Sequence, residues 1–296
     1  MRARSVSAGQ FIETARGRVH VRDSGSGVPL VLLHGWPESS YCWEPVLSYL
    51  GNGFRLIRPD LRGLGDSERT PDTEAYQKSE LAQDIIALLD EMGVSDFGLV
   101  GHDWGGAVAQ EVAIAVPERV QRLSIMNIHL LNNAVGMAAA NKAHAARQYR
   151  SYWYQYFMQI PKLSDVLIQG NERMFLSMFL RGNKGWEFPA DAVDEYVRCY
   201  QIDGTPGTGA NYYRAMALDA ARWRTLKDHR YQMPTLLLYG EHDPVVIKEF
   251  LEGHEACFDD VRLQFVDASH FVQEEQPEAV GQALNQHFLP LLSESN

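Results

Sequence analysis

Residues 101–106 read Gly-His-Asp-Trp-Gly-Gly and could carry a nucleophile, because an aspartate stands between glycines where a strand pattern gives way to a helix pattern. Residues 97–100 form a short apolar run typical of a strand, and residues 107–116 follow a helical pattern. A strand, a Gly-x-nucleophile-x-Gly turn and a helix together make a nucleophile elbow. Gly101 and Gly105 supply the small residues that such a tight turn demands.

Asp103 at the nucleophile position determines which chemistry this turn could perform. A carboxylate is already ionised at pH 7, so it needs no base to activate it. It can attack an sp3 carbon and form an alkyl ester with that carbon. The sequence therefore points to epoxides or alkyl halides as substrates rather than to ordinary esters.

A base must then regenerate the carboxylate by activating water against the ester. Among the ten histidines, His270 is favoured, because it follows the last predicted strand, residues 261–266, in a short loop. That loop leaves the sheet at the same edge as Asp103. In isolation such a histidine would be read as an exposed loop residue, but the elbow makes it the expected base.

The base needs an acid that fixes its tautomer. Asp243 directly follows the apolar strand at 236–239 and lies on the same predicted edge, with Glu241 as the nearest alternative. A competing acid position, just after the strand that ends at Met126, holds Asn127. The sequence therefore favours Asp243 as the acid.

Residues 34–37, His-Gly-Trp-Pro, follow the predicted strand at 30–33 and are expected to turn the chain toward the nucleophile. The backbone N–H of Trp36, with that of Trp104, would then form an oxyanion hole during hydrolysis of an ester on Asp103. A plain loop is the alternative. A cis peptide is also predicted between Trp36 and Pro37.

A glycine-rich loop at residues 60–67, Asp-x-Arg-Gly-x-Gly-x-Ser, is interpreted as structural. Its glycines would shape the turn and its charged side chains would pair with one another. The loop lacks the lysine of a phosphate-binding P-loop, so it is weak support for a phosphate site.

Strand and helix patterns alternate along most of the chain, which predicts an α/β fold with a mostly parallel, doubly wound sheet. The alternation stops over residues 132–225, where the pattern is helical, aromatic and rich in loops. We expect residues 1–131 and 226–296 to form a core domain, and residues 132–225 to form a helical lid inserted before the last two strands. The predicted elements are strands at 11–14, 19–22, 30–33, 54–57, 97–100, 120–126, 234–240 and 261–266, and helices at 79–92, 104–116 and 277–291.

Composition limits the other classes of function. The 296 residues are 45% hydrophobic and carry a formal net charge of −11, which argues against a nucleic-acid partner. No apolar run is long enough for a membrane helix, and none follows the arginines of residues 1–7, so neither membrane association nor a secretory signal is expected. Three widely spaced cysteines suit reduced thiols in the cytoplasm and give no metal-ligand pattern. The sequence leaves open a monomer or a homodimer.

The residues of the elbow and of the first loop resemble the α/β-hydrolase fold superfamily, over essentially all of residues 10–292. The chain order Asp103, Asp243, His270 is that family's order of nucleophile, acid and base. Gly-His-Asp-Trp-Gly-Gly together with His-Gly-Trp-Pro resembles the soluble epoxide hydrolases and the related dehalogenases. The sheet motifs do not separate these two groups, whereas the lid does.

Epoxide hydrolases of this family use two lid tyrosines as proton donors to the epoxide oxygen. The resemblance places them at Tyr154, in the aromatic run 151–157, and at Tyr213, in the segment Asn-Tyr-Tyr-Arg at 211–214. Four tyrosines crowd residues 149–156, so aromatic packing is the alternative explanation for any one of them.

Dehalogenases differ from this chain in the residues that receive the halide or hold the substrate. Haloalkane dehalogenases usually place asparagine where this chain has Trp36. Fluoroacetate dehalogenases place arginines at the positions of Trp104 and Ala107, and a His-Trp pair at Tyr154 and Gln155. Dehalogenation with the same triad is therefore the second hypothesis, and a ligand-binding protein without catalysis is a third.

The resemblance implies an epoxide hydrolase that converts an apolar epoxide to a vicinal diol through a covalent ester. Trp36, Trp104, Tyr154 and Tyr213 are the expected substrate-binding residues. Water is the second substrate, and no metal or organic cofactor is expected.

Overall fold

A single eight-stranded sheet forms the centre of the computed structural model, which describes residues 8–294. The strand order is β1-β2-β4-β3-β5-β6-β7-β8. Strands β3 to β8 run parallel to one another, while β1 and β2 are antiparallel additions at one edge. The predicted α/β fold is confirmed. The strands are β1 (Gln10–Thr14), β2 (Gly17–Gly25), β3 (Val28–Leu33), β4 (Phe54–Pro59), β5 (Phe97–His102), β6 (Val120–Met126), β7 (Thr235–Gly240) and β8 (Val261–Val266).

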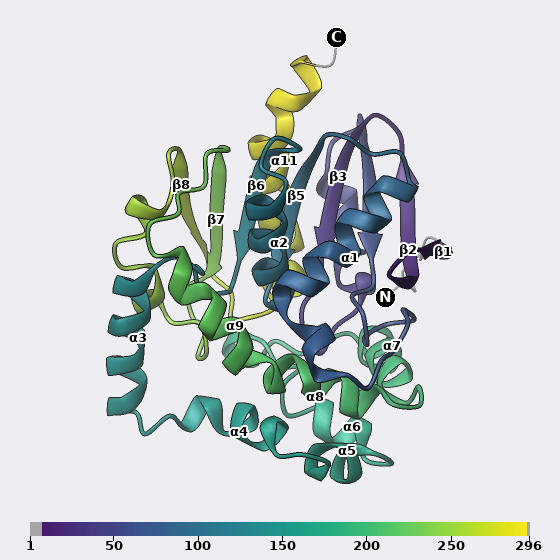
Figure 1. The fold of residues 1–296 in the computed structure, drawn as a ribbon, viewed down its shortest axis with the longest axis vertical. Helices are drawn as coiled ribbons and strands as arrows, with labels where there is room; N and C mark the ends of the chain where they lie inside the picture. Colours follow the sequence, from purple (N-terminus) through teal and green to yellow (C-terminus); the bar gives the residue numbers. More distant parts are fainter. Residues whose placement is uncertain (1–7, 295–296) are drawn as a thin grey trace.

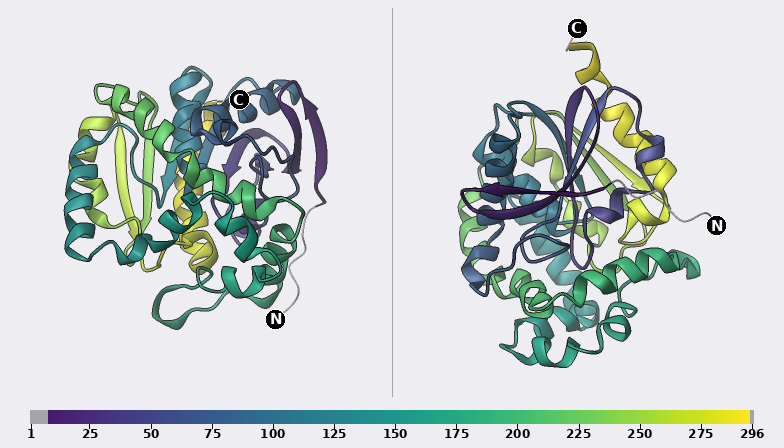
Figure 2. Two further views of the ribbon diagram at one scale, coloured as in Figure 1. Left: turned by 60° about the horizontal axis from the view of Figure 1, so that its bottom comes forward. Right: turned by 90° about the vertical axis from the view of Figure 1, so that its right-hand side faces the viewer.

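The central strands are apolar along their length because helices cover both faces of the sheet. Every residue of β5 and of β7 is buried. Figure 2 shows α1 and α2 on one side of the sheet and the long helix α11 on the other. These core helices are α1 (Lys78–Glu91), α2 (Trp104–Ala115) and α11 (Pro277–Glu294), with the short α10 (Val272–Glu275) before α11.

The predicted helical insertion lies between β6 and β7, before the last two strands, as expected. Figure 1 shows it gathered at one end of the sheet, below the strands in that view. Residues 132–225 contain no named strand, only an isolated bridge between Arg181 and Glu187. The helices are α3 (Ala134–Ala146), α4 (Trp153–Gln159), α5 (Leu163–Ile168), α6 (Glu172–Leu176), α7 (Ala190–Tyr200), α8 (Thr205–Arg214) and α9 (Met216–Trp223).

Eight short 3-10 turns complete the elements among the described residues. They are η1 (Ser40–Trp43), η2 (Leu47–Tyr49), η3 (Thr73–Tyr76), η4 (Arg150–Tyr152), η5 (Asn183–Gly185), η6 (Arg224–Leu226), η7 (Lys248–Leu251) and η8 (His254–Cys257). Residues 1–7, where the sequence predicts no secretory signal, lie outside the described residues. Over residues 8–294, none of the helices combines the length and the apolar character needed to cross a membrane.

Ion pairs join α9 of the insertion to the core helices. Arg222 donates to the buried Glu111 of α2, with N···O distances of 2.6–2.9 Å, and the indole of Trp223 adds a hydrogen bond of 2.9 Å to Glu111. Lys78 at the start of α1 pairs with Asp219 of α9 at 2.9 Å. The insertion is thus fastened to the core, and its assignment as a separate lid domain stays a prediction.

The sheet order explains where the chemistry-bearing loops meet. The chain goes from β3 outward to β4 and then returns to place β5 on the other side of β3. The order of the strands reverses between β3 and β5, and such a switch point opens a crevice at their carboxyl ends. The loop after β3 carries Trp36 and the turn after β5 carries Asp103, so the fold brings the two together.

Candidate active site

Asp103 occupies the turn between β5 and α2 in a conformation that non-glycine residues rarely adopt. Its φ is 50° and its ψ is −129°. A Cβ at Gly101 would lie 2.3 Å from the carbonyl oxygen of Gly105, and a Cβ at Gly105 would lie 2.2 Å from that of His34. The two glycines are therefore required by close backbone contacts, as the elbow pattern predicts. The strained turn presents the Asp103 carboxylate at the sheet edge.

The backbone of the loop after β3 reaches the Asp103 carboxylate. The N–H of Trp36 donates to Oδ1 of Asp103 at 2.8 Å. A Cβ at Gly35 would lie only 2.4 Å from that same oxygen, so only glycine permits this approach. The Trp36–Pro37 peptide is cis, as predicted.

His34 fixes the shape of this loop from inside the protein. Its Nδ1 lies 2.8 Å from the carbonyl oxygen of Gly35, and its Nε2 accepts the backbone N–H of Leu61 at 2.9 Å. One ring nitrogen faces an acceptor and the other faces a donor, which defines a neutral imidazole protonated at Nδ1. His34 therefore acts as a structural link between two loops rather than as a base.

His270, Asp243 and Asp103 form a connected chain of side chains. Nδ1 of His270 lies 2.7 Å from Oδ2 of Asp243, and Nε2 of His270 lies 3.4 Å from Oδ2 of Asp103. The structure thus brings together the three residues that the sequence proposed as acid, base and nucleophile.

Asp243 is held in place by donors on three sides. Its Oδ1 accepts the backbone N–H groups of Val245 at 2.8 Å and Val246 at 3.0 Å. Its Oδ2 accepts the amide of Asn127 at 2.8 Å, from the position that the sequence considered for a competing acid. Glu241, the alternative acid, is exposed. Asp243 is the carboxylate that faces the imidazole.

The charges of these three side chains favour an ion pair between His270 and Asp243 in the free protein. Burial alone would raise the pKa of Asp243, but the charge of His270 and the donated hydrogen bonds outweigh burial and lower it to about 2. Burial alone would lower the pKa of His270, but the carboxylates of Asp243 and Asp103 raise it well above its ordinary value. The carboxylates on either side of the ring therefore favour the imidazolium form of His270.

Tyr154 on α4 and Tyr213 on α8 come from the insertion and meet above Asp103. Their rings lie edge to face with centroids 5.6 Å apart. The indole of Trp36 packs against both, stacked on Tyr154 at 5.7 Å and perpendicular to Tyr213 at 5.4 Å. Burial raises the pKa of both hydroxyls, so both tyrosines remain protonated O–H donors.

A cavity of about 210 Å³ lies between the insertion and the sheet edge, and five of the seven predicted site residues line it. This volume is smaller than the roughly 300–1,000 Å³ of common ligand sites. Most lining residues are apolar or aromatic, with the carboxylate, the imidazole and the two hydroxyls as reactive groups. The lining residues are Trp36, Asp103, Ser151, Trp153, Tyr154, Met178, Phe179, Arg181, Tyr213, Pro244, Val245, Ser269, His270 and Phe271.

Trp104 does not appear among the residues that line this cavity. Its indole packs edge to face against the ring of Tyr213, with centroids 5.5 Å apart. The same indole also contacts the ammonium of Lys78, which lies 3.9 Å from the ring centroid. The side chain therefore supports Tyr213 from behind, while its backbone N–H begins α2 directly after Asp103.

A larger cavity of about 480 Å³ lies elsewhere along the insertion, bordered by α5, α7 and α8. None of the seven predicted site residues lines it. Its arginines are engaged by the protein itself, since Arg214 pairs with Asp165 at 2.6 Å and Arg69 donates to Thr205 and to two carbonyl oxygens. We therefore assign the chemistry to the smaller cavity.

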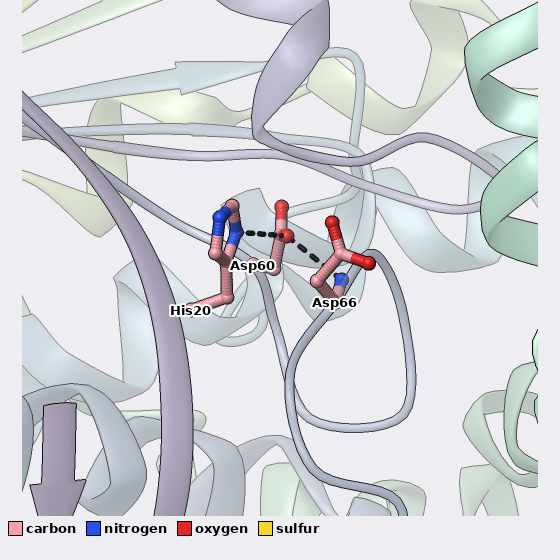
Figure 3. Close-up of side chains that lie close together, drawn as sticks. All are labelled: His20, Asp60 and Asp66. Carbon is pink, nitrogen blue, oxygen red and sulfur yellow. Dashed lines mark hydrogen bonds and ion pairs between the residues drawn. The ribbon is translucent and has the colours of Figure 1, made fainter. Parts of the chain in front are cut away.

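The side chains of His20, Asp60 and Asp66 lie close enough together to suggest a metal site (Figure 3). The carboxylates of this cluster, however, are engaged in hydrogen bonds and an ion pair within the protein. Oδ2 of Asp60 lies 2.7 Å from Nδ1 of His20 and accepts the N–H of Asp66 at 2.9 Å, and Oδ1 accepts the N–H of Ser40 at 2.7 Å. The Asp66 carboxylate is engaged by Arg198 at 2.8 Å. The cluster braces the 60–67 loop, in agreement with its structural interpretation.

Sequence reasoning missed several residues that contact the site. The indole Nε1 of Trp36 donates to the hydroxyl of the buried Tyr200. The ring of His102, beside the nucleophile in sequence, contacts the backbone carbonyl of His270 at 2.8 Å through Nε2, and its Nδ1 lies 3.1 Å from the amide of Gln273. The one sequence feature that could have indicated the role of His102 is its place next to the nucleophile, at the end of a strand that is apolar enough to be buried.

Comparison with known proteins places this geometry in a family. Residues 28–277 match the model of the alpha/beta hydrolase fold. The chain is 31% identical to epoxide hydrolase 4 of Mus musculus over 281 residues, covering 88% of this chain and 76% of that protein. It is 30% identical to the soluble epoxide hydrolase of Corynebacterium sp. strain C12, covering 93% and 94%.

Comparison with solved structures agrees with the comparison of sequences. The structure of the epoxide hydrolase CorEH superimposes with a TM-score of 0.81 at 28% identity, covering 96% of this chain and 99% of the other. The chain therefore belongs to the α/β-hydrolase fold family. Within that family its relatives at about 30% identity make it an epoxide hydrolase-like hydrolase.

Proposed function

We propose that this protein hydrolyses small apolar epoxides to vicinal diols through a covalent ester on Asp103. The observation that carries the proposal is the cavity whose lining combines the carboxylate of Asp103 with the side chains of Tyr154 and Tyr213. Its volume of about 210 Å³ and its aromatic lining suit a small apolar substrate. The names of the relatives support the same reaction class.

Ring opening begins when an oxygen of the Asp103 carboxylate attacks one ring carbon from the side opposite the epoxide oxygen. A C–O ester bond forms and the C–O bond of the ring breaks, so the negative charge moves to the epoxide oxygen. Tyr154 and Tyr213 donate hydrogen bonds to this oxygen, and one of them gives it a proton. The product of this half-reaction is a hydroxyalkyl ester.

Ester formation also prepares the base. The Asp103 carboxylate loses its charge when it becomes an ester, so one of the two carboxylates that raise the pKa of His270 disappears. The imidazolium then releases its proton, and the tyrosinate left by ring opening gains one, so the tyrosine hydroxyl is restored. His270 becomes the neutral base that the second half-reaction requires.

Hydrolysis follows at the ester carbonyl. His270, oriented by Asp243, takes a proton from water, and the water oxygen bonds to the carbonyl carbon of Asp103. The backbone N–H groups of Trp36 and Trp104 stabilise the resulting oxyanion. When the intermediate collapses, the C–O bond to the substrate breaks and the proton of the newly added hydroxyl passes to the departing oxygen, which completes the diol. Asp103 returns to its carboxylate form, and His270 retains the proton that it took from the water.

Isotope labelling under single-turnover conditions tests the route. With excess enzyme in H₂¹⁸O, the diol should carry no ¹⁸O and the label should enter Asp103, because water attacks the ester rather than the epoxide. A labelled diol would contradict the covalent route. Offering chloro- and bromoalkanes in parallel separates the alternative function, since halide release with epoxides left intact would identify a dehalogenase.

The two half-reactions should respond differently to pH. Decay of the ester requires neutral His270, so its rate should rise with pH through an apparent pKa below the pKa of His270 in the free protein. The physical reason is the loss of the Asp103 charge on esterification. Stopped-flow ester decay against pH, compared with an NMR titration of the His270 ring, measures both values. An ester-decay pKa equal to or above that of the free protein would contradict this order of events.

A further inference from the structure

Lys78 has a fully buried side chain and lies directly behind the proposed active site. Its ammonium is 2.9 Å from Oδ2 of Asp219, 2.6 Å from the carbonyl oxygen of Tyr212 and 3.9 Å from the ring centroid of Trp104. Lysines are almost never fully buried unless they are paired. These contacts give the buried charge three different partners, and two of them adjoin residues of the site.

Asp219 joins this lysine to the insertion. Its Oδ2 accepts the ammonium, and its Oδ1 accepts the backbone N–H of Lys78 at 2.9 Å. Lys78 is the first residue of α1, and Gln77 before it provides no side-chain cap. A carboxylate from α9 therefore caps a core helix, in the position where the helix dipole favours negative charge. Both charged side chains have about 1% exposure or less, so the pair is shielded from solvent.

The carbonyl of Tyr212 belongs to the peptide that continues into Tyr213. Tyr212 lies in the last turn of α8, where backbone carbonyls lack partners within the helix. The ammonium of Lys78 binds this carbonyl and so fixes the peptide plane that precedes Tyr213. Cations are also favoured at a helix C-terminus.

The ring of Tyr213 rests on the second group that Lys78 holds. Trp104 packs edge to face against Tyr213, and the ammonium of Lys78 contacts the indole in a cation–π arrangement. The backbone of Tyr213 and the support of its ring therefore depend on the same buried cation.

We propose that Lys78, paired with Asp219, is a positioning residue that holds the hydroxyl of Tyr213 where it donates to the opening epoxide. The role of Tyr213 rests on the proposed function. Lys78 does not touch the substrate cavity and acts only through the Tyr212 carbonyl and the Trp104 ring. A displacement of about 1 Å of a reacting group can cost up to about 100-fold in rate.

Two variants separate this role from simple stability. Lys78→Met removes the cation but leaves Asp219 buried without its partner, which is strongly destabilising. The double variant Lys78→Met with Asp219→Leu removes both charges and replaces them with apolar side chains. We expect both variants to form the ester about 10- to 100-fold more slowly than wild type, while decay of the ester is unchanged.

A double-mutant cycle with Tyr213→Phe identifies the group through which Lys78 acts. If Lys78 positions the Tyr213 hydroxyl, the double charge removal should slow ester formation in wild type but have little further effect when that hydroxyl is absent. Additive effects would overturn the proposal, and so would equal slowing of ester formation and ester decay.

Arg222→Met is the matched control, because Arg222 also fastens α9 to the core but does so through Glu111 on α2. Its loss should leave ester formation at the wild-type rate. An equal slowing in this variant would mean that general loosening of the insertion, rather than the Lys78 contacts, explains the effect.

A spectroscopic measurement tests the positioning role of Lys78 without any substrate. If no epoxide forms an ester with the wild-type protein, the proposed function is contradicted, but this measurement still tests the position of Tyr213. In protein labelled with ¹³C-tyrosine, the Tyr213 signal is assigned by its absence in Tyr213→Phe. We expect this signal to shift in the double charge-removal variant and to stay in place in Arg222→Met. A Tyr213 signal unmoved by loss of the Lys78–Asp219 pair would overturn the positioning role.

Discussion

Replacing His270 with asparagine should stop the reaction at the covalent ester. Asp103 is ionised without help from a base, so it still attacks the epoxide, whereas water is no longer activated. Turnover should fall by about 10²- to 10⁴-fold, the range that general-base catalysis supplies. Intact-mass spectrometry should then show the protein heavier by the mass of one epoxide.

Two further variants make this measurement specific. Adding Asp103→Asn to His270→Asn should abolish the mass increment, and peptide mapping of the single variant should place it on the segment that contains Asp103. His254→Asn, at a histidine that contacts a backbone carbonyl away from the cavity, should turn over normally. An inactive His270→Asn protein with no adduct would contradict the separate roles of Asp103 and His270.

The elbow could be predicted from the sequence because its requirements are local. A tight turn needs small residues at fixed spacings around Asp103, and the structure confirms this at Gly101 and Gly105 through contacts below 3 Å. The positions of Asp243 and His270 followed from a second rule, that parallel strands end at one edge. The geometry agrees with both rules, and the chemical roles stay predictions.

The contacts behind the site could not be predicted because they join distant parts of the chain. Trp36 and Tyr200 are 164 residues apart, and His102 contacts the backbone of His270 across 168 residues. A buried tyrosine on a helix has the same local pattern whether it only packs or binds an indole. Contacts of this kind can be identified only once the position of the insertion relative to the sheet is known.

The burial of Lys78 likewise could not be predicted from the local sequence. A lysine at the start of an amphipathic helix is ordinarily exposed, and the sequence placed the start of this helix at Ser79. The structure buries Lys78 because Asp219, far along the chain in the insertion, supplies the opposite charge. Trp104 likewise was expected to bind substrate, yet its indole packs against Lys78 and Tyr213 rather than lining the cavity.

Removing both lid hydroxyls should have the largest effect on ring opening. In the double variant Tyr154→Phe with Tyr213→Phe, the alkoxide would form in an apolar cavity with no donor. Either single variant should slow ester formation by about 10- to 1,000-fold, and the double variant should be slower than both. Rapid-quench mass spectrometry in the His270→Asn background measures this rate without interference from hydrolysis.

The comparison with Tyr156→Phe separates proton donation from aromatic packing. Tyr156 belongs to the same helix α4 as Tyr154, but its side chain is 59% exposed. Loss of its hydroxyl should leave ester formation unchanged. Phenylalanine keeps the ring contacts among Trp36, Tyr154 and Tyr213 at nearly equal volume, so packing alone predicts little change in the double variant. A double variant that forms the ester at the wild-type rate would therefore assign the two tyrosines to packing and leave the epoxide oxygen without an identified donor.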